Sequence, residues 1–141
     1  VLLVVTEAAL AQASAVIALL DDERQKPTLT PEQVEAVVSS TRALNQAAIM
    51  LHRQLLGVEA ALRVIEPLRA IAGIVQAAAR QVLQLRPPLV KRTVASETNL
   101  RLLAHQWYCD HTRASEIFRL NPTLRNPQAI NVGEVLRAYA R

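Results

Sequence analysis

The chain has 141 residues, of which 51% are apolar, 20% charged and 3% aromatic, and its formal net charge is +4. The apolar fraction excludes a disordered tail, because such tails lack enough apolar surface to bury. The single cysteine excludes a disulfide scaffold and a zinc site built from several cysteines.

Three long helices are predicted in the first part of the chain, where Ala, Leu, Val, Gln, Arg and Glu dominate. We expect them over about Val4–Arg24, Pro31–Leu55 and Val58–Leu85. Pro67 lies inside the third and predicts a kink or a break into two helices. The most apolar stretch, Val1–Leu20, is interrupted by polar residues, so we expect no membrane span.

The second helix has a clear start signal and a packing pattern. Thr30 and Gln33 have the spacing of a capping box, and Pro31 suits the first helical position. Apolar residues on the second and third helices then alternate steps of three and four, which indicates a coiled coil or helical hairpin. The predicted helix-packing seam comprises Val34, Val37, Leu44, Leu51, Leu55, Ile65, Leu68, Val75 and Val82.

Arg86-Pro87-Pro88 ends the helical region, because proline cannot continue a helix. The boundary predicts a helical bundle over residues 1–86 and a small module over residues 87–141. In the module we expect an extended segment at Leu89–Val94, helices near Leu100–Trp107 and Ala114–Leu120, the second capped by Thr112, and a strand at Glu134–Tyr139. The fold class is therefore mainly α, with a strand–helix–helix–strand module at the end. Its predicted core comprises Leu103, Trp107, Ile117, Phe118, Leu120 and Leu136.

Three runs in this last segment, Leu100–Ala104, Arg113–Pro122 and Val132–Arg137, resemble the LysM-like module of contractile phage tail proteins. More narrowly, the segment resembles the C-terminal end of the DNA circularisation (DNA circulation) proteins of Mu-like phages. It differs from that pattern at Cys109, where such modules usually have glycine, and at Asn131, where proline is common. Because the chain begins with Val1 and lacks that family's N-terminal domain, we expect it to be part of a longer polypeptide.

The resemblance implies a virion protein of the phage tail or baseplate, made in the host cytoplasm. Its expected partners are other tail or baseplate proteins and further copies of itself, with the small module used for docking. The first alternative is a DNA-binding protein that protects or circularises the injected genome. The second alternative is a peptidoglycan-binding module.

Charge favours contact with an acidic partner or with DNA at the C-terminal end. Residues 1–55 carry four basic and six acidic side chains, whereas residues 56–141 carry twelve basic and six acidic ones. Arginine pairs in a bidentate manner with phosphate and carboxylate groups, although a solvated face is the plainer interpretation. The candidate contact residues for a partner or DNA are Arg113, Arg119, Arg125, Arg137 and Arg141.

Catalytic chemistry is not indicated. The sequence has no nucleophile-elbow motif and no glycine-rich phosphate loop, so we expect no enzyme activity, cofactor or small-molecule substrate. His105, Cys109 and His111 have metal-ligand side chains, but too few ligands lie near them for us to expect a metal site. The run Asp21–Glu23 is interpreted as a solvated turn. Glu66 is expected to form a structural ion pair with Arg63 or Arg69.

Overall fold

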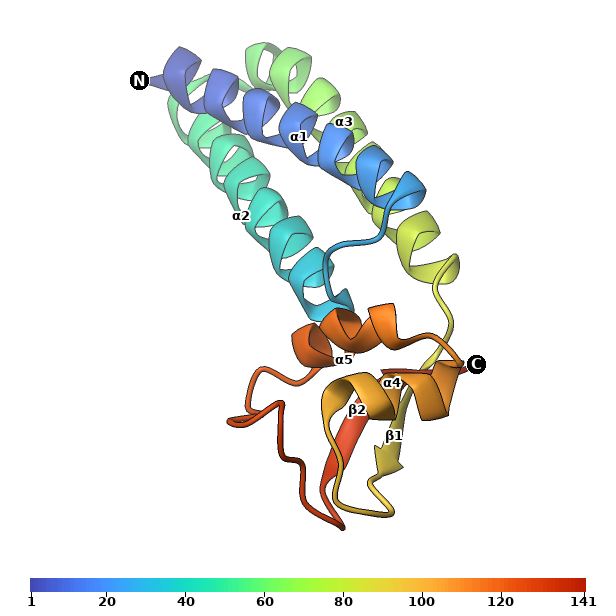
Figure 1. Cartoon of the computed structure of the whole chain (residues 1–141). Coiled ribbons are helices and arrows are strands. Elements are labelled where there is room, and N and C mark those ends of the chain that lie inside the picture. The colour runs from blue at the N-terminus through green and yellow to red at the C-terminus, as the bar shows by residue number, and fades with distance from the viewer. The chain divides into compact units, whose positions relative to one another are not determined.

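The computed structural model describes residues 1–141, which form two compact units, Val1–Leu85 and Arg86–Arg141. The first unit is a bundle of three helices, α1 (Leu2–Gln25), α2 (Pro31–Leu55) and α3 (Val58–Gln84). Each helix packs against the other two, and successive helices run in opposite directions (Figure 1). The prediction of a mainly helical protein is confirmed.

The helix boundaries follow from local chemistry. Thr30 Oγ1 accepts a hydrogen bond from the backbone N–H of Gln33, and Gln33 Oε1 accepts one from the N–H of Thr30, so the predicted capping box is confirmed. Helix α3 is not broken into two at Pro67. Pro67 is exposed, so water can bond the carbonyl group of Arg63 that loses its helical partner.

The apolar core of the bundle consists of two clusters. One comprises Ala13, Val16, Leu20, Val34, Val38, Val75, Ala79 and Val82, and the other comprises Ala9, Ala48, Ile49, Ala61, Ile65 and Leu68. On α2 the two clusters are separated by Thr41 and Asn45, whose side chains are buried although they are polar. Gln12 of α1 donates a hydrogen bond to Thr41 Oγ1 at 3.4 Å. Helix α2 therefore contributes two polar side chains to the middle of the bundle interior.

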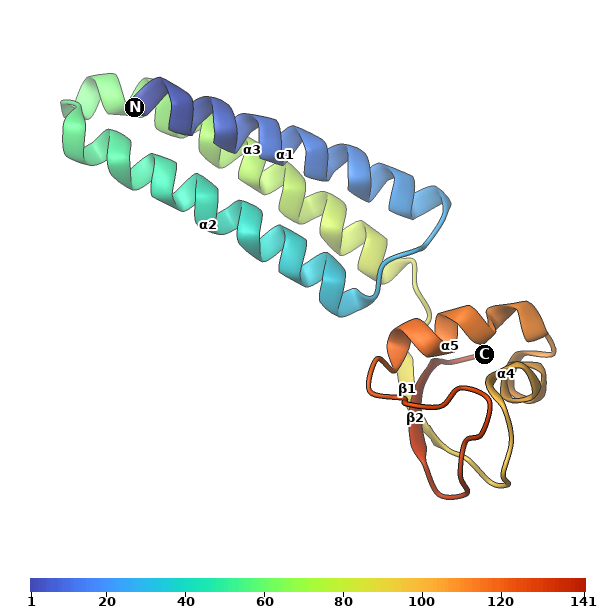
Figure 2. The same ribbon diagram turned by 60° about the vertical axis from the view of Figure 1, so that its left-hand side comes forward.

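The second unit has the order strand, helix, helix, strand, as predicted. It contains β1 (Leu89–Thr93), α4 (Leu100–Tyr108), α5 (Ala114–Leu120) and β2 (Val135–Tyr139), with a short 3-10 turn before α5. The two strands pair antiparallel, and both helices belong to the same unit (Figure 2). Asn99 caps α4, because its Oδ1 accepts from the N–H of Leu102 at 2.9 Å.

The core of the second unit lies between the helices and the strand pair. It comprises Val94, Leu100, Leu103, Ala104, Tyr108, Ile117, Ile130, Leu136 and Ala138, with Trp107 partly buried against it. Leu120 is also buried. The prediction that Phe118 belongs to this core is wrong, because its side chain is 44% exposed. Helix α5 has only seven residues, and Ile117 takes the inward position beside Phe118.

Candidate functional site

The packing face of α2 is rotated from the predicted seam. Val34 is buried as predicted, but Val37, Leu44 and Leu51 are only half-buried. Leu55 is 60% exposed, so its assignment to the seam is wrong. The buried face of α2 comprises Val34, Val38, Thr41, Asn45, Ala48, Ile49 and His52. A helix that contacts two neighbours buries a broader face than a two-stranded seam requires. The seam residues of α3, which are Ile65, Leu68, Val75 and Val82, are all buried.

Two polar side chains on this face have unmet hydrogen-bonding capacity. His52 Nε2 lies 2.6 Å from Thr6 Oγ1, while its Nδ1 has no hydrogen-bond partner. Asn45 is 2% exposed, and neither its Oδ1 nor its Nδ2 has a partner. A buried polar group without a partner costs about 1–3 kcal/mol of stability. Sequence reasoning missed both residues because it followed the apolar positions, although the spacing of Thr41, Asn45 and His52 fits the same repeat.

Glu23 is not part of a solvated turn, so that interpretation is corrected. Its side chain is buried, with 3% exposed, while Asp21 and Asp22 are exposed. The Glu23 carboxylate accepts hydrogen bonds from the backbone N–H groups of Thr28 and Leu29 and from the Thr28 hydroxyl. It therefore fixes the connection between α1 and α2.

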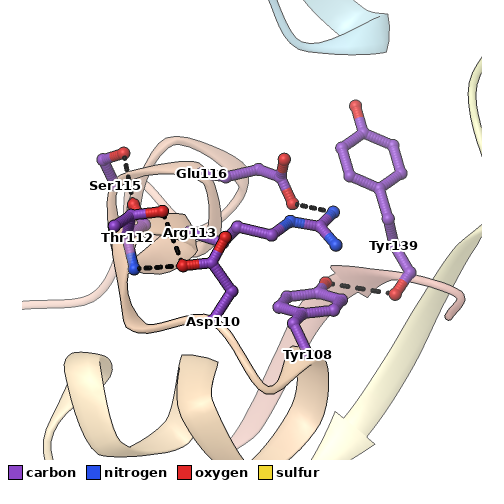
Figure 3. A network of polar contacts seen from close by, with 7 residues as sticks. All are labelled: Tyr108, Asp110, Thr112, Arg113, Ser115, Glu116 and Tyr139. Atoms are coloured by element: carbon purple, nitrogen blue, oxygen red, sulfur yellow. Dashed lines mark hydrogen bonds and ion pairs between the residues drawn. The ribbon is translucent and has the colours of Figure 1, made fainter.

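Arg113 lies in a network inside the second unit rather than on an open surface (Figure 3). Its guanidinium lies 3.7 Å from the centre of the Tyr108 ring and donates to Glu116 at 2.7 Å. The Tyr108 hydroxyl donates to the carbonyl oxygen of Tyr139 at 3.1 Å. Burial, and secondly the charge of Glu116, raise the pKa of Tyr108 above its ordinary value. These contacts hold the start of α5 against α4 and the end of β2.

The turn before α5 is held by Asp110. Its Oδ1 accepts from the backbone N–H of Thr112 at 2.9 Å and from the Thr112 hydroxyl at 2.6 Å. These hydrogen bonds, the hydroxyl one foremost, lower the pKa of Asp110. Thr112 therefore does not cap α5 as predicted, because its hydroxyl is used within the turn.

The remaining candidate arginines lie at separate places on the second unit. Arg119 and Arg125 are exposed, and Arg125 lines a groove of about 390 Å³ formed by the connection between α5 and β2. Arg137 lies directly opposite Lys91 across the strand pair, and both line a second groove of about 330 Å³. Like charges directly opposite each other in a sheet repel.

Cys109 occupies a backbone position that favours glycine. It follows α4 in the left-handed conformation, with φ 57°, where glycine has no steric penalty. Its Sγ accepts a hydrogen bond from the Arg141 guanidinium at 3.6 Å. Arg141, the fifth candidate arginine, therefore lies beside Cys109. No group of three or more His, Cys, Asp or Glu side chains in the structure is placed to hold a metal ion.

Large apolar side chains are exposed at one end of the bundle. This end is formed by the start of α1, the end of α2 and the start of α3 (Figure 2). The exposed residues there are Leu3, Val4, Met50, Leu55, Val58 and Leu62, and Leu55 and Val58 are 60% and 80% exposed. We call this set the apolar end. Large exposed apolar side chains at one end of a bundle are candidates for contact with a partner.

Helix α1 is long and apolar enough to cross a membrane by length and composition alone. Core helices of soluble proteins and signal sequences also pass this test. In the structure α1 buries Ala9, Ala13, Val16 and Leu20 within the bundle. The absence of a membrane span stays a prediction.

Comparisons with known protein families, with curated proteins and with solved structures find no match to this chain.

Proposed function

We propose that the chain is a structural component of a contractile phage tail or baseplate, located near the hub, that acts by assembling with other proteins. The bundle supplies packing surfaces, and the second unit serves as a LysM-like docking module. The observation that carries the proposal is the apolar end, where Leu55 and Val58 expose most of their side chains to solvent. The resemblance of residues 100–137 to tail modules supports the phage assignment.

Self-association through the apolar end is the first property to test. Sedimentation velocity over a range of concentrations should show that the whole chain forms oligomers. The Leu55→Ser and Val58→Ser variants should shift toward the monomer, because each removes exposed apolar area. Leu85→Ser is the matched control, since Leu85 is 67% exposed but follows the opposite end of α3. A chain that stays monomeric, or equal effects of all three substitutions, would argue against assembly through this end.

DNA binding is the alternative with its own observation. The second unit carries nine basic and four acidic side chains, and Lys91 faces Arg137 across the strands. If this face binds phosphates, affinity for linear duplex DNA should fall steeply with salt. Replacing both Lys91 and Arg137 by Gln should lower the slope of log affinity against log salt by about two. Absence of binding at low salt would remove this alternative. Peptidoglycan binding is supported by the resemblance alone.

A further inference from the structure

A basic groove runs between α2 and α3 on the side of the bundle. It has a volume of about 310 Å³ and is lined by Arg42 and Arg53 of α2 and Arg69 of α3. The amide side chains of Gln46 and Gln76 also line it, and no acidic residue does. The sequence did not single out this site, because its arginines come from two helices and are far apart along the chain.

The three arginines have no internal counter-ion. The expected pairing of Glu66 with Arg63 or Arg69 does not form, and neither Arg42 nor Arg53 takes part in an ion pair. Successive helical turns place Arg42 and Arg53 about 16 Å apart along α2, because the rise is about 1.5 Å per residue. The groove therefore presents a row of positive charge.

Asn45 gives the groove a second and independent feature. Asn45 is among the residues that line the groove and also an adjoining cavity of about 140 Å³ beside Thr41 and Val75. The side chain is 2% exposed, and both of its polar atoms lack hydrogen-bond partners. The adjoining cavity leaves room beside this residue for the polar tip of a long partner side chain.

The residues of α3 that line the groove include two with very small side chains. Ala72 and Gly73 line the groove, and a side chain at Gly73 would meet open space. A helix seated there would occupy the position of the fourth helix in a four-helix bundle. Small residues at this place allow such a helix to approach closely.

We propose that this groove binds an acidic helical segment of a partner protein, whose carboxylates pair with Arg42, Arg53 and Arg69. The carboxylate of one glutamate of that segment accepts a hydrogen bond from Asn45 Nδ2. The bundle itself carries seven basic and eight acidic residues, so a long polyanion such as DNA would meet as many repelling as attracting groups. Duplex phosphates would also stay at the surface and leave Asn45 unreached. This inference does not depend on the phage role proposed above.

The probe is a synthetic alanine-rich helical peptide with glutamates along one face, labelled for fluorescence anisotropy and titrated with the whole chain at low salt. A matched peptide with glutamine in place of each glutamate is the charge control. We expect the acidic peptide to bind and the control peptide not to bind. Absence of binding, or equal binding of both peptides, would overturn the proposal.

Substitutions in the groove test whether the acidic peptide binds there. Replacing Arg42 and Arg69 together by Gln should weaken binding about tenfold, because charge-assisted hydrogen bonds are lost. Arg80→Gln is the matched control, since Arg80 is exposed on α3 but does not line the groove, and it should leave affinity unchanged. Asn45→Leu should also weaken binding while the chain stays folded. Equal losses from Arg80→Gln and the double variant would show unspecific attraction and contradict the assignment.

Two further results would show that the groove binds something other than an acidic helix of a partner protein. If linear duplex DNA displaces the peptide with the same dependence on Arg42 and Arg69, the groove is a phosphate site. If the whole chain forms a dimer that the double variant dissociates, while Leu55→Ser does not, the occupant is a second copy of the chain. Failure of the apolar-end variants alone affects only the proposed assembly function.

Discussion

The side chain of Asn121 bonds to both backbone groups of Arg137. Its Oδ1 accepts from the N–H of Arg137 at 2.8 Å, and its Nδ2 donates to the carbonyl oxygen of Arg137 at 2.8 Å. The same Nδ2 donates to the carbonyl oxygen of Ile117 at 2.8 Å. One amide thus supplies hydrogen-bond partners to both backbone groups of Arg137 in β2 and joins this strand to the end of α5.

Asn121→Ala should destabilise the second unit by about 2–4 kcal/mol, because backbone groups next to a buried side chain lose their partners. The measurement is urea unfolding followed by the fluorescence of Trp107, which is the only tryptophan and reports on this unit. Asn126→Ala is the control, since Asn126 is exposed and bonds only within its own turn. Equal small effects of the two substitutions would refute the clamp.

Glu23→Ala should destabilise the bundle by about 2–4 kcal/mol, because two backbone N–H groups and a hydroxyl lose a charged acceptor. Thermal unfolding followed by circular dichroism reports mainly on the three long helices. Asp22→Ala should change the midpoint little, since Asp22 is exposed on the same turn. A similar loss in both variants would mean that the loop does not depend on the buried carboxylate.

Asn45→Leu should stabilise the isolated chain by about 1–3 kcal/mol, because an unpartnered buried amide is replaced by an apolar group of similar size. The adjoining cavity of about 140 Å³ leaves room for the new side chain. Asn45→Asp should do the opposite, since it buries a charge without a partner. Circular dichroism melts of both variants check this, and destabilisation by Leu would show that Asn45 is satisfied in solution.

Cys109→Gly should stabilise the second unit by about 1 kcal/mol, because the residue has a positive φ of 57° that glycine adopts without strain. Cys109→Ala keeps the strain and serves as the control. Urea midpoints from Trp107 fluorescence give the comparison. A stabilisation by Ala as large as that by Gly would point to the thiol itself as the source of the effect.

Tyr108 should make the second unit less stable at alkaline pH. Its pKa is raised in the folded state above the ordinary value of 10.0, mainly by burial, so the unfolded chain loses this proton first. The stabilising effect is complete below pH 10.0 and is lost as the pH rises through that value toward the folded pKa. Tyr108→Phe should reduce this alkaline loss, although it removes the hydrogen bond to Tyr139 at every pH. Unfolding midpoints of both proteins on either side of that pH measure the difference, and an identical alkaline loss would contradict the assignment to Tyr108.

The sequence was informative where one local signal decides a structure. The capping box at Thr30 placed the start of α2, and the double proline placed the end of the helical region. Two neighbouring faces of α2 share Val34, Thr41 and Ala48, and local signals do not show which of the two is buried in the bundle. The apolar pattern favours the face with Leu44 and Leu51. Packing against α1 and α3 buries the face with Asn45 and His52 instead.

Residues whose roles depend on distant partners could not be predicted. Glu23 matters because the backbone of Thr28 and Leu29 turns back to it, and a charged run by itself gives no sign of that. In the sequence, Asn121 indicates only the end of a helix, because its hydrogen-bond partner Arg137 lies 16 positions further along the chain. The basic groove is of the same kind, because Arg69 joins Arg42 and Arg53 only once α3 packs against α2.

The most direct test of the assembly role is fractionation of phage particles from cells that carry this sequence. Tails and heads are separated after disruption, and each fraction is analysed by mass spectrometry for peptides of this chain. We predict that the chain is recovered with the tail fraction in constant proportion to the other tail proteins. Its recovery only from the soluble lysate, or with the packaged DNA, would contradict a structural role in the tail.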